Sequence, residues 1–196
     1  MNETVTIRPA LPSDGIEIGR IFTESWRETY PGLLPDHVLT GLVPSEISRR
    51  WTAFLTDGKA RARTLVAQDG EGGGLCGYAV WGGARDRLLG YDAEVYELYL
   101  DPAHQGRGLG RALLAACFRA VAQAGGRSAV IWALEGNPAR WFYERHGGVL
   151  TAERRSSRWG AERVELAFGW RMLSLRKAPR GQSEPIPRGT PSTGAA

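Results

Sequence analysis

Residues 94–111 read E-V-Y-E-L-Y-L-D-P-A-H-Q-G-R-G-L-G-R. The first seven residues are rich in aromatic and aliphatic side chains, which predicts a strand over Glu94–Leu100. Apolar residues then recur at helical spacing over Leu109–Ala124, and two glycines follow as a stop signal. Three more glycines, at positions 106, 108 and 110, separate strand and helix, so backbone N–H groups there are free to face a ligand. The stretch therefore predicts a phosphate site at a helix N-terminus.

The glycine spacing separates this loop from two other phosphate loops. A G-x-G-x-x-G motif would need glycine where Arg111 or Leu113 stands. No G-x-x-x-x-G-K-[ST] segment occurs in the chain, so a P-loop is excluded. The pattern that remains is Gln105-x-x-Gly108-x-Gly110. Its alternative interpretation is a flexible turn before an ordinary core helix.

Three segments resemble the GNAT acetyltransferases. The loop is similar to their pyrophosphate signature [QR]-x-x-G-x-[GA], which binds coenzyme A. Residues 137–148, N-P-A-R-W-F-Y-E-R-H-G-G, are similar to the family's N-x-x-A-x-x-F-Y-x-x-x-G-F, with Gly148 in place of the usual aromatic residue. The segment W-R-E-T-Y-P-G-L-L-P from Trp26 resembles the first-helix region of members that act on small amines.

The predicted order of elements, β-α-α-β-β-β-α-β-α-β-β, is also that of the GNAT family, to about Arg171. The predicted strands are a short one at Val5 and Ile7, then Thr64–Gln68, Leu75–Trp81, Glu94–Leu100, Ala129–Leu134, Val149–Arg155 and Glu162–Arg171. The predicted helices run from Ser13 or Asp14 to about Tyr30, then over Ser45–Thr56, Leu109–Ala124 and Pro138–His146. The resemblance implies an α/β (α+β) fold whose mixed, mostly antiparallel sheet splays between a central parallel strand pair, with helices on both faces.

Local signals support two of these helix starts. Glu17 follows Asp14 in capping-box register, and Asn137 precedes a proline at the first helical position. The passage between the first two helices, Leu33–Leu42, permits only a short helical turn.

Composition bounds the organisation of the chain. With 196 residues, 42% hydrophobic content and seven Trp, one core is expected, in a domain over residues 1–174 followed by a disordered tail over residues 175–196. The net charge is +4 and the arginines are scattered, which argues against a nucleic-acid partner. No apolar run suggests a signal peptide or a membrane span, so a cytoplasmic protein is expected.

Cysteine and histidine usage gives no metal prediction. Cys76 and Cys117 lie in apolar patterns typical of reduced core positions. The three histidines, His37, His104 and His146, show no ligand spacing.

The resemblance implies where acetyl-CoA binds. Its pantetheine arm would pair with the backbone of a strand whose neighbour diverges, and its pyrophosphate would lie on the glycine loop. The implied cofactor-binding residues are Leu98, Tyr99, Leu100, Gln105, Gly106, Arg107, Gly108, Leu109, Gly110, Arg111, Asn137 and Tyr143.

Two catalytic residues are predicted. Glu94 corresponds to the general base of the histone-acetylating branch and, by strand alternation, shares a face with Leu98 and Leu100. Glu97 is the second choice, on the opposite face; for either, a solvated carboxylate or an arginine salt bridge is the alternative. Tyr143 corresponds to a tyrosine that can hydrogen-bond or protonate the leaving thiolate, its alternative being core packing.

The predicted function is direct transfer of acetyl from acetyl-CoA to a primary amine of a small or amino-acid-like metabolite, without a covalent enzyme intermediate. Protein N-terminal or lysine acetylation and a non-catalytic acyl-CoA sensor are the alternatives. The acceptor cleft depends on the loops at residues 31–44 and 82–92. Trp26, Tyr30 and Trp51 are assigned no role, and a homodimer through the last strands is left open.

Overall fold

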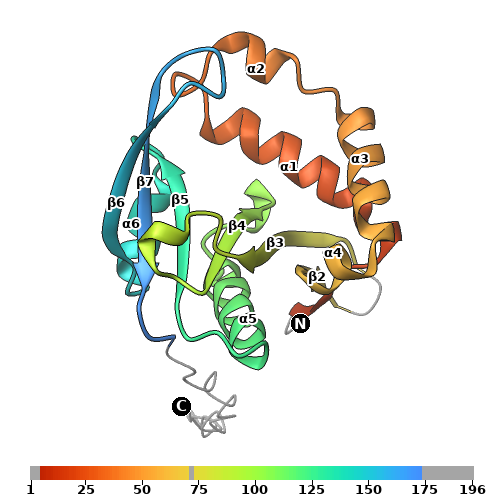
Figure 1. The fold of residues 1–196 in the computed structure, drawn as a ribbon. Coiled ribbons are helices and arrows are strands. Elements are labelled where there is room, and N and C mark those ends of the chain that lie inside the picture. Colours follow the sequence, from red (N-terminus) through yellow and green to blue (C-terminus); the bar gives the residue numbers. More distant parts are fainter. Residues whose placement is uncertain (1–4, 71–72, 174–196) are drawn as a thin grey trace, which may run out of the picture.

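A seven-stranded sheet with the order β1-β2-β3-β4-β5-β7-β6 forms the centre of the computed structural model, which describes residues 5–70 and 73–173 (Figure 1). Its strands are β1 (Val5–Pro9), β2 (Thr64–Asp69), β3 (Leu75–Gly83), β4 (Ala93–Leu100), β5 (Ala129–Leu134), β6 (Val149–Ser156) and β7 (Arg163–Trp170). Neighbouring strands are antiparallel except for β4 and β5, which are parallel. The predicted mixed sheet with one parallel pair is confirmed. The tail predicted at residues 175–196 lies outside the described residues.

Helices cover both faces of this sheet, as predicted. The helices are α1 (Gly15–Thr29), α2 (Asp36–Thr40), α3 (Pro44–Thr56), α4 (Gly58–Ala62), α5 (Leu109–Gln123) and α6 (Ala139–Arg145). On one face, Leu113 and Cys117 of α5 share a core with Tyr143 of α6. On the other face, where Figure 1 shows α1 and α3, Ile18 and Ile21 of α1 pack with Leu55 of α3 and the sheet. The candidate active site is lined by residues from helices on both faces, α1 on one and α5 and α6 on the other.

The parallel pair β4–β5 is hydrogen-bonded over only part of its length. Three residue pairs match, from Ala93 with Ala129 to Val95 with Ile131, and the strands then diverge (Figure 1). The backbone of residues 96–100 therefore faces β5 without a strand partner. An unpaired strand edge of this kind leaves N–H and C=O groups for a ligand.

A β-bulge in β4 changes which side chains share a face. Val80 pairs with Glu97 while the next residue of β3, Trp81, pairs with Val95, so Tyr96 is an extra residue. Such a residue shifts the alternation of side chains by one position. Val95 therefore lies in the same core as Leu98 and Leu100. The predicted shared face of Glu94 with Leu98 and Leu100 is wrong, because Glu94 and Glu97 both lie on the other face.

Two further local predictions differ from the structure. Asp14 precedes α1, but its carboxylate accepts from Arg8 Nη1 at 2.7 Å and from the Leu11 backbone N–H at 2.7 Å, and no side chain caps α1. The capping box is therefore wrong: an arginine supplies a stronger, charged donor. The short helix α4 was not predicted; Asp57 caps it by accepting from the Lys59 backbone N–H at 2.6 Å.

The end of α6 explains the glycine at position 148. A Cβ atom on Gly148 would lie 2.8 Å from Trp170 Cζ2 and 2.9 Å from the Tyr143 carbonyl oxygen. The Trp170 indole of β7 also donates its N–H to the His146 carbonyl oxygen at 2.9 Å. The indole of Trp170 therefore fills the space beside position 148 and leaves no room for a side chain there.

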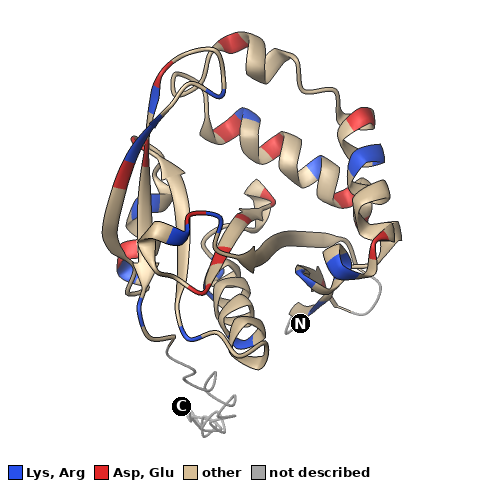
Figure 2. Ribbon diagram, in the orientation of Figure 1, with Lys and Arg blue, Asp and Glu red and all other residues tan. Residues whose placement is uncertain are grey.

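Charges are dispersed along the helices. Acidic and basic positions alternate along α1 in Figure 2. Among residues 5–70 and 73–173, no helix is long and apolar enough to cross a membrane.

Candidate active site

A cleft of about 340 Å³ opens where β4 and β5 diverge. Its walls come from the ends of both strands, the start of α5, and residues of α1 and α6. Eight of the predicted cofactor-binding residues line it: Leu98, Tyr99, Leu100, Gln105, Gly106, Gly110, Asn137 and Tyr143. The other four do not, since Arg107, Gly108 and Arg111 are exposed beside it and Leu109 is buried.

Glycine is favoured in the loop and at the start of α5 for two different reasons. Gly106 and Gly108 have φ angles of +75° and +79°, which side-chain-bearing residues rarely adopt. Gly110 lies inside the helix, where a Cβ would be 3.3 Å from Phe142 Cε2. Because the first N–H groups of a helix have no partner within it, the first turn of α5 presents donors and a partial positive charge beside the cleft.

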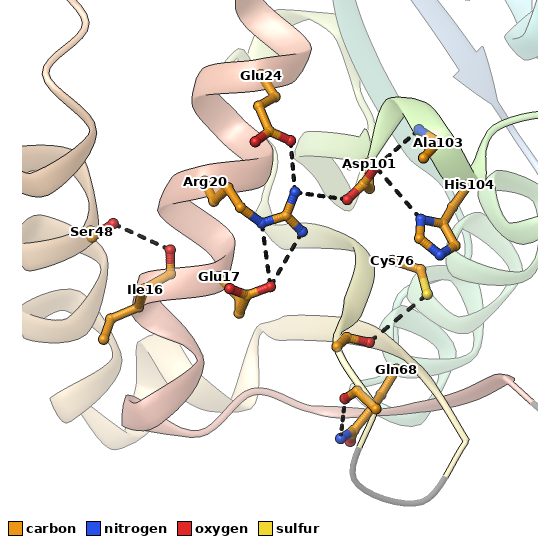
Figure 3. Close-up of polar contacts among 12 residues, drawn as sticks. Ile16, Glu17, Arg20, Glu24, Ser48, Gln68, Cys76, Asp101, Ala103 and His104 are labelled. Atoms are coloured by element: carbon orange, nitrogen blue, oxygen red, sulfur yellow. Dashed lines mark hydrogen bonds and ion pairs between the residues drawn. The ribbon is translucent and has the colours of Figure 1, made fainter.

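A cluster of charged groups fixes the end of β4 to α1 (Figure 3). Arg20 of α1 contacts Asp101 at 2.8 Å and Glu24 at 2.6 Å. Asp101 accepts from the Ala103 backbone N–H at 2.9 Å and lies 3.5 Å from Nδ1 of His104. Partial burial raises the pKa of Asp101, but the hydrogen bonds from Arg20 and the Ala103 backbone N–H, together with the charge of Arg20, outweigh it and hold that pKa below the ordinary value. These contacts of Asp101 therefore fix the point at which the chain leaves β4 and enters the glycine loop.

Glu94, the predicted general base, is buried away from the cleft. Its side chain is 1% exposed. Its carboxylate accepts from the Arg85 backbone N–H at 3.0 Å and from Arg85 Nε at 3.0 Å, with a further short contact to Nη2. The salt bridge that the sequence left open as the alternative is thus present.

Removing the partner of Glu94 is expected to destabilise the fold. Arg85→Met leaves a buried carboxylate without its countercharge, and because the arginine side chain is 53% exposed we expect a loss of only about 2 kcal/mol in the free energy of unfolding. Urea denaturation measures the loss. Arg87→Met, at an exposed position of the same loop, is the matched control. Equal stability of both variants would contradict a structural role for this ion pair.

Glu97 borders the cleft instead. It lines the cleft together with Tyr96 and Leu98, and Tyr78 donates its hydroxyl to Glu97 Oε2 at 2.7 Å. Desolvation raises the pKa of Glu97 above its ordinary value, while the Tyr78 hydrogen bond and the charge of Arg85 act in the opposite direction. A carboxylate at a cleft whose pKa is raised is a stronger base than an ordinary carboxylate and is suited to accept a proton from a substrate.

Tyr143 faces the cleft from α6. It is 5% exposed, and its ring packs against Phe142 and Phe168 at centroid distances of 5.5 and 5.7 Å. Burial raises the pKa of its hydroxyl, so the group is protonated at neutral pH. Within residues 5–70 and 73–173, nothing hydrogen-bonds this hydroxyl. It is therefore available as a donor.

A hydrogen-bonded chain of polar groups forms the far wall; the sequence predicted Tyr99 and Asn137 as cofactor-binding residues but assigned no role to Tyr30 or Ser25. The Tyr30 and Tyr99 hydroxyls are 3.1 Å apart, and Asn137 Nδ2 lies 3.5 Å from the Tyr30 oxygen. Asn137 Oδ1 also accepts from the Ala139 backbone N–H at 2.9 Å, which orients the amide at the start of α6. Ser25 of α1 donates to the Leu100 carbonyl oxygen at 2.8 Å. The segment from Trp26 that resembles small-amine enzymes was the signal for Tyr30.

The two cysteines are core residues. Cys76 and Cys117 are buried, and neither lines the cleft. Burial raises the pKa of Cys117 to about 12, so its thiolate is scarce at neutral pH. The fold does bring together three possible metal ligands that sequence spacing did not reveal, since donor atoms of Asp69, Cys76 and His104 lie within 4.8 Å of one another. This cluster contributes no residue to the cleft.

Comparisons with known proteins agree with this geometry. Residues 60–147 match the family described as acetyltransferase (GNAT) domain. An uncharacterized N-acetyltransferase, YuaI of Bacillus subtilis (strain 168), is 35% identical over 173 residues, which is 88% of this chain and 96% of that protein.

Solved structures share the fold. The yncA structure from Salmonella typhimurium with its cofactor acetyl-CoA has a TM-score of 0.61 at 23% identity, over 91% of this chain and 99% of that one. The PaiA N-acetyltransferase from Thermoplasma acidophilum in complex with coenzyme A has a TM-score of 0.62 at 16% identity, over 83% and 98%. With the splayed strand pair, the glycine loop and the relative at 35% identity, the chain belongs to the GNAT superfamily of N-acetyltransferases.

Proposed function

We propose that the protein transfers the acetyl group of acetyl-CoA directly to a primary amine of a small or amino-acid-like metabolite. The observation that carries the proposal is one continuous cleft that has the glycine loop at one end and Glu97 and Tyr143 along its walls. In the two solved structures of this fold named above, coenzyme A or acetyl-CoA is bound.

The cleft offers complementary groups along the length of acetyl-CoA. The pantetheine amides would pair with the backbone of Leu98–Leu100 on the side that faces β5, and the pyrophosphate would lie on residues 105–111, where Arg107 and Arg111 add positive charge. Asn137 would contact the cofactor from the side of α6. A strand N–H polarises the thioester carbonyl in this arrangement.

In this proposal Glu97 acts as the general base. Forming the neutral amine at pH 7 costs roughly 4 to 5 kcal/mol for a lysine-like amine of pKa ~10.4 and about 1 kcal/mol for an α-amine of pKa ~8. The carboxylate removes the ammonium proton, directly or through water, and the amine nitrogen then attacks the thioester carbon to form the C–N bond. Glu94, predicted for this role from its sequence position, is held by Arg85, so we assign the base to Glu97.

Tyr143 is placed to act as the general acid. When the tetrahedral intermediate collapses, the C–S bond breaks, the sulfur leaves with the electron pair as a thiolate, and the nitrogen releases its surplus proton to solvent to give the neutral amide. The Tyr143 hydroxyl then hydrogen-bonds or protonates this sulfur, because it is protonated and has no competing partner in the described residues. Both cysteines are buried outside the cleft, which supports direct transfer over an acetyl-cysteine intermediate.

A thiol-release screen tests the function. Acetyl-CoA is incubated with the protein and a panel of amines, amino acids and peptides, and acceptor-dependent release of CoA is the expected result. Faster turnover of peptides than of every small amine would favour protein acetylation. Coenzyme A binding by calorimetry, with no turnover of any acceptor, would favour an acyl-CoA sensor.

Removing the Tyr143 hydroxyl tests its role as the general acid. Tyr143→Phe is expected to lower kcat by about 10- to 100-fold, because the sulfur then leaves without a proton donor. Tyr91→Phe is the matched control, since it removes a buried hydroxyl that contacts Thr151 at 3.3 Å, away from the cleft. A Tyr143→Phe rate within about twofold of the parent would assign this tyrosine to core packing.

A further inference from the structure

A second cleft adjoins the first on the α1–α3 side of the sheet. Its volume is about 750 Å³, and its lining includes Tyr96 and Glu97, which also line the first cleft. The proposed base thus lies on the border between the two spaces. A ligand in the second cleft can present an amine to Glu97 while a thioester occupies the first.

The second cleft is lined mainly by aromatic and aliphatic side chains. Aromatic rings come from four separate parts of the chain: Phe22 and Trp26 of α1, Trp51 and Phe54 of α3, Tyr96 of β4, and Trp159 between β6 and β7. Phe22 and Trp26 stack with their centroids 4.8 Å apart, and Trp51 meets Phe54 edge-on at 5.5 Å. Such a lining favours a flat or bulky apolar body over a polar chain.

Three charged side chains line the same cleft: Arg50, Arg85 and Glu97. Arg85 is engaged by Glu94, and its guanidinium lies 4.7 Å from the centroid of the Tyr96 ring. Arg50 of α3 is exposed and makes no hydrogen bond or ion pair within the described residues. It is therefore a cation available to a ligand, beside an apolar wall.

We propose, on the basis of the acetyl-transfer function above, that the acceptor is a primary amine carried on an aromatic or large aliphatic body that also bears an anionic group. The body occupies the second cleft, the amine reaches Glu97, and the anion pairs with Arg50. Polyamines fit poorly, because their additional ammonium groups would lie beside two arginines. Amino acids with aromatic side chains belong to the favoured class.

Matched acceptors test this class by thiol release. The probes are phenylalanine, with a carboxylate beside the amine, 4-(2-aminoethyl)benzoate, with a carboxylate at the far end, 2-phenylethylamine, with none, and glycine and spermidine. At least one of the two anionic aromatic amines is expected to exceed 2-phenylethylamine, glycine and spermidine in kcat/KM by about tenfold. Whichever is preferred fixes the place of the anion.

Arg50→Met tests the contact itself. It is expected to lower kcat/KM for the preferred anionic acceptor by about fivefold to tenfold, mainly through KM, and to leave 2-phenylethylamine within about twofold. Arg49→Met is the matched control: Arg49 is the exposed neighbour on α3 and does not line this cleft, so both acceptors are expected to be unaffected. Equal losses in the two variants would overturn the role of Arg50.

A binding measurement separates this proposal from the function on which it rests. Trp26, Trp51 and Trp159 line the second cleft, so the preferred acceptor is expected to change tryptophan fluorescence in the CoA-loaded protein, even if turnover is absent. Turnover of glycine or spermidine as fast as the anionic aromatic amines overturns the acceptor class and leaves acetyl transfer standing. If the aromatic probes give neither a fluorescence change nor turnover, the acceptor class is overturned as well. Turnover of no amine, despite an acceptor-induced fluorescence change, contradicts the catalytic function alone.

Discussion

Replacing Glu97 by glutamine is expected to lower kcat by about 10²- to 10³-fold, which is the usual contribution of a positioned general base. The amide keeps the size of the side chain and its hydrogen bond with Tyr78, but it cannot take the proton from the acceptor ammonium. Steady-state thiol release with a good acceptor measures the effect, and calorimetry with CoA is expected to give unchanged affinity. A large loss in Glu94→Gln, with Glu97→Gln within about twofold of the parent, would return the base to Glu94.

The pH profile gives an independent test of the same assignment. Glu97 must be ionised to accept a proton, so activity is lost as pH falls through its pKa, which desolvation raises above the ordinary 4.5. The Tyr78 hydrogen bond lowers this pKa, so Tyr78→Phe is expected to move the acid limb of the kcat profile to higher pH. An unmoved acid limb in Tyr78→Phe would show that another group controls it.

Gly110→Val is expected to weaken coenzyme A binding by about 10- to 100-fold. A Cβ at this position would already lie 3.3 Å from Phe142 and 3.5 Å from Leu100 Cδ1, and valine adds two methyl groups. Overpacking of this kind costs about 1–3 kcal/mol, and here it displaces groups at the place where the cofactor must approach the helix. Calorimetric titration with CoA measures the loss.

The matched control for this variant is Ala115→Val on the same helix. Ala115 is half-buried and lies outside the cleft, so the change introduces the same side chain into the same helix without touching the cofactor. Its CoA affinity is expected to equal that of the parent. If Gly110→Val binds CoA as tightly as Ala115→Val does, the cofactor does not approach the backbone at the start of α5.

Sequence-based prediction was most accurate where the signals are local. The strand Ala129–Leu134 has the predicted bounds, and α5 ends one residue before the predicted Ala124. A short apolar run and a helical repeat bounded by glycines can each be recognised within a window of about ten to twenty residues. The loop residues that line the cleft were predicted for the same reason, since the glycine spacing is contained in six positions.

Features that depend on pairing between distant segments could not be predicted. The face on which Glu94 lies, opposite Leu98 and Leu100, follows from a register shift against β3, which no alternation within β4 reveals. The Arg85–Glu94 ion pair was open only as one alternative, because its partner lies in an irregular loop. The second cleft combines α1, α2, α3 and the turn before β7, and the positions of such segments follow from tertiary packing.

The additional residue at Tyr96 limits how the length of this strand can vary. Deleting Tyr96 would restore regular alternation. The side chains before this residue would then turn to the opposite face of the sheet relative to those that lead into the glycine loop. Either Val95 would leave the hydrophobic core, or Glu97 would turn its carboxylate toward Leu113 and Cys117. The one-residue bulge therefore lets β4 meet two requirements that a regular strand could not meet together: a continuous apolar core on one face and an ionisable group on the other.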